Sequence, residues 1–110
     1  MRMVFFDFAA FHNCDFSTSD LQFMSFAGSR IHHCTFENSE LIRDNFGGTE
    51  IWDCNFNHSN LYDSRFINSK LQNVDFINCC LTKCSFIQAK SQEVNMKSSN
   101  TAEAVFDWEE

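Results

Sequence analysis

Large apolar residues recur at every fifth position along most of the chain. From Phe6 to Phe86, each position on this lattice is Phe, Leu or Ile, and every leucine of the sequence falls on it. In most repeats a small residue stands two positions earlier, as Cys54 does before Phe56, and the other positions are largely polar. Five is neither a helical period nor the period of a strand. The pattern therefore predicts neither an amphipathic helix nor an ordinary half-buried strand.

The lattice predicts a chain that turns through about a right angle every five residues. One large and one small residue of each repeat point inward, and four repeats, or 20 residues, complete a coil. Successive coils then stack at the ~4.8 Å spacing of neighbouring strands. Residues 20 apart support this register, because Arg30, Glu50 and Lys70 form a column of alternating charge.

The stretch Cys54-Asn55-Phe56-Asn57-His58 and the repeat that follows it resemble the pentapeptide-repeat family, whose pattern is Ala-(Asp/Asn)-Leu followed by any two residues. The resemblance covers residues 4–90. It implies an all-β fold, a right-handed quadrilateral β-helix of about five coils. It implies little about function, because one fold serves many roles.

The chain is expected to form a single domain over residues 1–110. Residues 1–8 are expected to be an N-terminal cap or incomplete coil, residues 9–98 the repeat coils, and residues 99–110 a C-terminal cap. Residues 100–103, Asn-Thr-Ala-Glu, are similar to a helix capping box. They favour a short C-terminal helix with Phe106 or Trp108 covering the last coil. The alternative is that Ala104 and Phe106 continue the lattice.

Charge and composition exclude several classes of protein. The formal charge of −7 argues against direct binding to nucleic acid, which needs a basic face. No apolar run approaches the ~20 residues of a membrane span, and no signal peptide is recognisable. Six cysteines without such a signal suggest reduced thiols in the cytoplasm. With 3 Gly and no Pro, the turns must be of a kind that Asn, Asp and Ser can make.

The chemically active side chains do not assemble into an obvious centre. Most cysteines stand at the small inward position and are expected to be buried and inert, whereas Cys80 should face solvent. His12 and His32 share an outward column without the ligand set that zinc needs. No catalytic triad or phosphate loop is visible, and a convex prism offers no cleft. We therefore expect no enzyme activity, cofactor or metal. Asp44 replaces a small inward residue, either to cap backbone amides of its own turn or as a recognition notch.

These features favour a non-enzymatic protein-interaction module. Carboxylates cluster on two adjoining faces of the first coils and are the candidate partner-binding residues: Asp15, Asp20, Glu37 and Glu40. The resemblance includes a quinolone-resistance branch, which implies an acidic DNA mimic that binds a DNA-handling enzyme such as DNA gyrase. It also implies a possible homodimer through the C-terminal end, where Phe106 and Trp108 are candidate contacts. The alternative is a structural scaffold or effector repeat module unrelated to topoisomerases.

Overall fold

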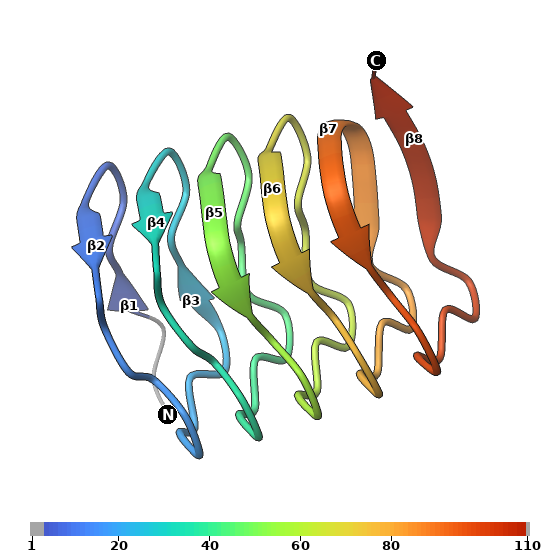
Figure 1. The fold of residues 1–110 in the computed structure, drawn as a ribbon, viewed down its shortest axis with the longest axis horizontal. Coiled ribbons are helices and arrows are strands. Elements are labelled where there is room, and N and C mark those ends of the chain that lie inside the picture. The colour runs from blue at the N-terminus through green and yellow to red at the C-terminus, as the bar shows by residue number, and fades with distance from the viewer. Residues whose placement is uncertain (1–3, 110) are drawn as a thin grey trace.

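Parallel strands stack coil upon coil along the chain (Figure 1). The computed structural model describes residues 4–109, and the side chains of residues 6–106. β1 (Val4–Phe5) pairs with β3 (Met24–Ser25). The second sheet has six strands in the order β2-β4-β5-β6-β7-β8, whose bounds are β2 Ala10–His12, β4 Arg30–His32, β5 Glu50–Asn55, β6 Lys70–Asp75, β7 Ser85–Asn95 and β8 Val105–Glu109.

The register between coils is 20 residues. Ile31 pairs with Ile51, Ile51 with Leu71, and the isolated bridges outside the strands follow the same step, as between Asn60 and Cys80. This confirms the right-handed quadrilateral β-helix that the sequence predicts. The sides of the prism are named below after one buried residue each: the Phe26, Ile31, Phe36 and Leu41 faces.

The lattice residues fill the axis of the prism. From Phe26 to Phe86 they are at most 2% exposed. Phenylalanines one coil apart lie nearly parallel, as Phe36 and Phe56 do with ring centroids 4.7 Å apart. Phenylalanines on adjoining faces meet edge to face, as Phe46 and Phe56 do at 5.9 Å. Both geometries are favoured by the charge distribution of an aromatic ring, so the core is a continuous aromatic stack.

The corners depend on residues in the left-handed region of backbone conformation. The second residue after each lattice position has a positive φ, as in Asn38 (55°), His58 (62°) and Gly48 (66°). Asn and Asp are frequent here, as expected from their tolerance of this region. Arg43 and Lys83 also adopt it, with φ of 58° and 62°. The turn therefore accepts long side chains as well, because they point into solvent at the corner.

The small inward residues are selected by a hydrogen bond as well as by size. Ser39 Oγ donates to the Phe16 carbonyl at 2.6 Å, and Cys79 Sγ donates to the Phe56 carbonyl at 2.8 Å. In each case the acceptor lies 23 residues earlier, on the preceding coil. The serine hydroxyl also accepts from the amide 20 residues earlier, as Ser59 Oγ does from Ser39 N–H at 3.3 Å. The repeat thus connects its coils through side chains as well as through strands.

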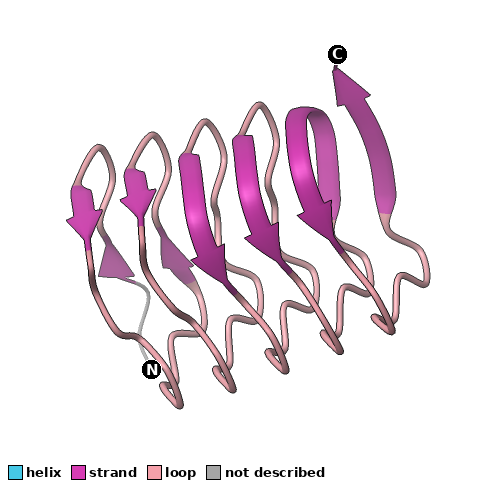
Figure 2. Cartoon of the chain, viewed as in Figure 1, coloured by secondary structure: helices cyan, strands magenta, loops and turns pink. Residues whose placement is uncertain are grey.

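The expected C-terminal helix is wrong. Strands and loops make up the described residues, without a helix (Figure 2), and Val105–Glu109 form β8, parallel to β7. Ala104 N–H donates to Thr101 O at 3.0 Å, the turn that Ser64 makes with Leu61 on an earlier coil. The alternative interpretation, a continued lattice, holds because β7 offers an open strand edge whose backbone groups β8 satisfies. A helix of so few residues would leave that edge unpaired.

Residues 4–8 add a partial coil at the other end. Phe6 stacks on Phe26 with centroids 5.5 Å apart, and its N–H donates to Ser25 O at 2.7 Å. Residues 1–3 of the expected N-terminal cap, and Glu110, lie outside the described residues. Within residues 4–109 there is no helix long and apolar enough to cross a membrane.

Candidate protein-binding surface

The candidate carboxylates lie on two adjoining faces at the N-terminal side of the prism. Asp15 and Glu37 belong to the Phe36 face, and Asp20 and Glu40 to the Leu41 face. Asp20 and Glu40 are register partners on successive coils, so the structure brings these two together. All except the half-buried Glu37 are exposed. We refer to this set as the acidic patch: Asp15, Asp20, Glu37 and Glu40.

Neutral neighbours hold the acidic patch in place. Asp15 Oδ1 accepts from Ser17 N–H at 2.9 Å and from Ser17 Oγ–H at 2.5 Å, and these bonds lower the pKa of the Asp15 carboxyl. Asn55 Nδ2 donates to Glu37 Oε1 at 3.2 Å. The bonds from Ser17 favour the ionised form of Asp15, and Glu37 is held by a neutral amide, so neither contact brings a cation to the patch.

Ion pairs in the described chain lie elsewhere. Arg43 pairs with Asp63 at 3.3 Å, and Glu50 Oε2 lies 3.9 Å from Arg30 Nε and 3.7 Å from His32 Nε2. Among the described residues, no Lys, Arg or His nitrogen lies within 4.0 Å of a carboxylate of the acidic patch. Like charges in register on adjacent strands are unfavourable for folding. Uncompensated carboxylates suit a basic partner, which they attract at long range.

Of the two candidate C-terminal contacts, the structure describes the side chain of Phe106 but not that of Trp108. Phe106 stacks on Phe86 with centroids 5.2 Å apart and remains 39% exposed, so it covers the aromatic stack and still presents apolar surface. Trp108 pairs with Ala89 through the backbone of β8, and its side chain is outside the described residues.

The cysteines are packing residues. Cys34, Cys54, Cys79 and Cys84 are buried, which confirms the expectation for these positions. Burial raises the pKa of the Cys54 and Cys84 thiols to about 12 and that of Cys79 to about 11. A thiol is a nucleophile only as the thiolate, so these groups are inert near neutral pH. Cys80 was expected to face solvent; it is half-buried, and its Sγ lies 3.5 Å from Thr82 Oγ1.

The histidines form stacking contacts on the Ile31 face. His32 lies parallel to Trp52 with centroids 4.6 Å apart, and His12 meets His32 edge to face at 5.1 Å. His33 lies 3.6 Å from Asp53, as the 20-residue register predicts. Within the part of the chain that the structure describes, no three His, Cys, Asp or Glu side chains come together as a metal site would require.

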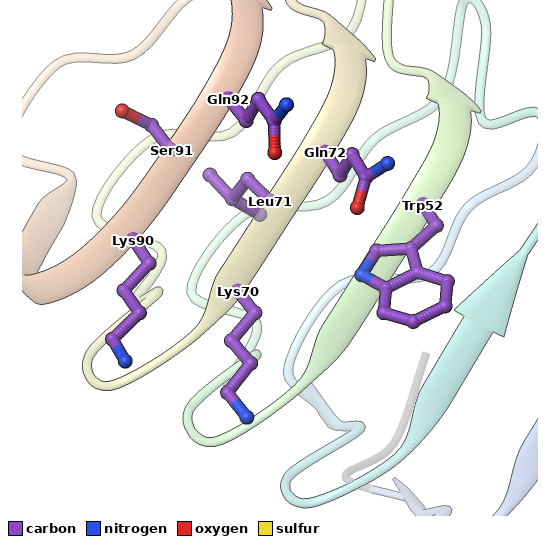
Figure 3. A pocket seen from close by; sticks show the side chains of 7 residues that line it. All are labelled: Trp52, Lys70, Leu71, Gln72, Lys90, Ser91 and Gln92. Carbon is purple, nitrogen blue, oxygen red and sulfur yellow. The ribbon is translucent and has the colours of Figure 1, made fainter. Parts of the chain in front are cut away.

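A shallow hollow on the Ile31 face was not predicted from the sequence. It has a volume of about 250 Å³ and lies over β5, β6 and β7 (Figure 3). Its lining residues are Trp52, Lys70, Leu71, Gln72, Lys90, Ser91 and Gln92. One feature of the sequence points to this hollow. Ser91 is the first residue after Phe86 to break the apolar lattice, and it follows Lys90, which is 20 residues after Lys70. We refer to this site as the lysine hollow.

Comparison with known proteins agrees with this architecture. The family described as "Pentapeptide repeat region" matches residues 29–106. No curated protein matches the sequence. Among solved structures, the chain is similar to HetL of Nostoc sp. strain PCC 7120, a pentapeptide repeat protein involved in heterocyst differentiation regulation. The TM-score is 0.83 with 16% identity over 87% of this chain and 40% of HetL.

Two further solved structures are similar. A pentapeptide repeat protein from the thylakoid lumen of Arabidopsis thaliana has a TM-score of 0.65 and 20% identity over 81% of this chain and 62% of its own. QnrB1, a plasmid-mediated fluoroquinolone resistance protein, has a TM-score of 0.46 and 17% identity over 89% of this chain and 61% of its own. The chain thus spans less than two thirds of the length of each. With a family match over most of its coils, the chain belongs to the pentapeptide-repeat family.

Proposed function

We propose that this chain is a non-catalytic protein-interaction module whose acidic patch binds a basic protein surface. The observation that supports this most is the register pairing of Asp20 with Glu40, exposed and without a cation in the described chain. Such a pair costs folding free energy, and a basic partner would compensate for that cost on binding.

The shape and the thiols support a role without catalysis. The lysine hollow has a volume of about 250 Å³, below the ~300–1,000 Å³ typical of small-molecule sites. Burial holds the pKa of Cys54, Cys79 and Cys84 well above neutral, which disfavours their use as nucleophiles. Six free thiols also fit the reducing cytoplasm that we propose as its location.

The partner that we would test first is a DNA-handling enzyme such as DNA gyrase. The resemblance to the quinolone-resistance branch suggests it, and the acidic patch would then occupy a DNA-binding surface as a mimic of the phosphate backbone. The longest extent of the chain is 28 Å. At ~3.4 Å per base pair this corresponds to about eight base pairs. A longer mimic would need two copies, and we propose that they pair through the C-terminal end, where Phe106 is exposed.

The test combines light scattering of the purified protein with a gyrase supercoiling assay, with and without a quinolone. We expect a dimer that inhibits or protects gyrase. Neutralising the acidic patch with Asp15→Asn, Asp20→Asn, Glu37→Gln and Glu40→Gln should remove the effect. A matched control changes charge by the same amount elsewhere, with Asp7→Asn, Asp75→Asn, Glu93→Gln and Glu103→Gln, and should retain it.

A monomer without any effect on gyrase at micromolar concentration would overturn DNA mimicry. The alternative that we would then adopt is a structural scaffold or effector repeat module unrelated to topoisomerases. An equal loss of activity in the acidic-patch variant and its control would also contradict the proposal, because net charge alone would then explain the binding.

A further inference from the structure

The lysine hollow carries the opposite charge to the acidic patch and lies on another face. Lys70 and Lys90 are register partners on β6 and β7, so their backbones are ~4.8 Å apart and both side chains leave the same side of the sheet (Figure 3). Gln72 and Gln92 form a parallel column two residues on. The hollow therefore lies between a column of cations and a column of amides.

The two lysines are uncompensated in the described chain. Glu50 is the register partner of Lys70 on β5, but its carboxylate pairs with residues of the preceding strand, β4. Its Oε2 lies 3.9 Å from Arg30 and 3.7 Å from His32. No described carboxylate lies within 4.0 Å of Lys70 Nζ or Lys90 Nζ. Lys90 is also in register with Glu109 of β8, whose side chain lies outside the described residues. In a protein of formal charge −7, two adjacent lysines without an ion pair among the described side chains are a local exception that favours an anionic ligand.

Trp52 gives the hollow an apolar end. Its indole lies parallel to the His32 ring, with an interplanar angle of 1°, so one face of the indole is covered. Trp52 also lines the hollow and is 37% exposed. Tryptophan is among the residue types that most often carry the binding energy of a protein interface.

Ser91 interrupts the apolar lattice beneath the hollow and is one of its lining residues. It is the register partner of Leu71 and stands where the lattice would place a large apolar residue. The opening is shallow and small, so it fits one or two side chains of a partner better than a whole small molecule.

We infer that the lysine hollow binds an acidic, extended segment of a partner polypeptide. An aromatic or apolar side chain of that segment would pack on Trp52, and carboxylates on one face of the segment would pair with Lys70 and Lys90. Alternate side chains of an extended peptide are ~6.7 Å apart, which flexible lysines on coils ~4.8 Å apart can match. The inference rests on the proposed function only in treating the chain as a protein-interaction module, and it uses a different face and a partner of opposite charge.

The test uses the full chain and a synthetic peptide in which glutamate alternates with threonine and phenylalanine stands at one end. The chain has two tryptophans, so a Trp108→Phe background makes Trp52 the only tryptophan, which is excited selectively over the single tyrosine. We expect the peptide to change Trp52 fluorescence with a Kd below about 1 mM and weaker binding at high salt. Lys70→Gln and Lys90→Gln should each weaken binding about two- to fivefold, as expected for an exposed pair. The combination Lys70→Glu with Lys90→Glu should abolish it.

Lys97→Gln, at an exposed lysine on the Phe36 face, is the matched control for Lys70→Gln and Lys90→Gln and should bind like the parent. Equal binding by the Lys70→Glu/Lys90→Glu variant, or equal binding of a peptide with glutamine in place of glutamate, would overturn the inference. Polyphosphate or hyaluronate binding as tightly as the peptide would overturn the assignment to a polypeptide.

The two sites are separable by experiment. The variant with a neutral acidic patch should still bind the acidic peptide, and the Lys70→Glu/Lys90→Glu variant should still act on the basic partner. If the neutral-patch variant loses the acidic peptide as well, the hollow is not an independent site and the inference fails.

Discussion

Asp44 accepts a hydrogen bond from the backbone N–H of Met24, 20 residues earlier, at 2.8 Å from Oδ1. Elsewhere a serine makes this contact, as Ser64 Oγ does with Asp44 N–H at 3.1 Å. Ser64 also donates to the Leu41 carbonyl at 2.6 Å, which an ionised carboxylate cannot do. Asp44 is 1% exposed, and its Oδ2 is buried without a hydrogen-bond partner in the described chain. The Asp44 carboxyl group therefore caps a backbone amide, but one on the preceding coil and not in its own turn as the sequence suggested, and its burial costs desolvation free energy.

We predict that Asp44→Ser stabilises the protein at neutral pH and removes a pH dependence. Burial raises the pKa of Asp44 from 3.8 to about 8 in the folded state. Both states are protonated below about pH 4; between pH 4 and 8 only the unfolded state loses its proton, so stability falls as pH rises. Each pKa unit corresponds to roughly 1.4 kcal/mol, so the loss amounts to a few kcal/mol. Urea unfolding of both proteins from pH 4 to pH 9 measures the difference.

Asp15→Ser is the matched control for Asp44→Ser. The pKa of Asp15 is lowered by the hydrogen bonds from Ser17, so this carboxylate stabilises the folded state above its unfolded pKa. Asp15→Ser should slightly lower the free energy of unfolding at neutral pH, whereas Asp44→Ser should raise it. Parallel pH profiles of the wild-type protein and Asp44→Ser would show that Asp44 is ionised when folded, contrary to this account.

The next prediction concerns thiol reactivity. A small disulfide reagent at neutral pH should modify Cys80 and Cys14, which are half-buried, before Cys54, Cys79 and Cys84. Burial raises the pKa of the last three thiols. Their Sγ atoms also donate to backbone carbonyls, as Cys84 Sγ does to the Leu61 carbonyl at 2.8 Å. Peptide mapping by mass spectrometry identifies the order, and adding urea should equalise the rates. Early labelling of Cys54 in the folded protein would contradict the assigned burial.

The sequence predicts those contacts that recur with the 20-residue period of the coil. The core, the register of Arg43 with Asp63, and the His12–His32–Trp52 column follow directly, because the residues of each set are 20 apart. The continued lattice at the C-terminus was only the second choice because residues 100–103 carry a local helix signal, which the open edge of β7 overrides. The lysine hollow was not predicted because it depends on which cations pair with Glu50. The spacing of residues along the chain does not determine that pairing.

A truncation in the middle of the stack should cost far more than one at its end. Phe56 is fully buried and lies between Phe36 and Phe76, with centroids 4.7 and 4.9 Å away. Phe56→Ala should lower the free energy of unfolding by about 3–5 kcal/mol. Phe106→Ala, at a position that is 39% exposed, should lower it by clearly less. Chemical denaturation measures both, and equal losses would mean that the last coil is as tightly packed as the centre.

The final prediction concerns the corner at Gly48, whose φ is +66°. A Cβ at this position would meet Gly28 N and Cα at 3.8 and 3.9 Å, which is ordinary contact, so space does not exclude a side chain. Conformation decides the cost instead: Gly48→Ala should destabilise by about 1 kcal/mol. Gly48→Asn should cost less, because Asn38 and Asn68 already adopt this backbone with φ of 55° and 59°. Gly48→Val should cost most, since a β-branched residue is poorly tolerated at positive φ. Thermal unfolding of the three variants should therefore rank Asn above Ala and Ala above Val, and a reversed order would show that contacts with Gly28 outweigh backbone strain at the corners of this β-helix.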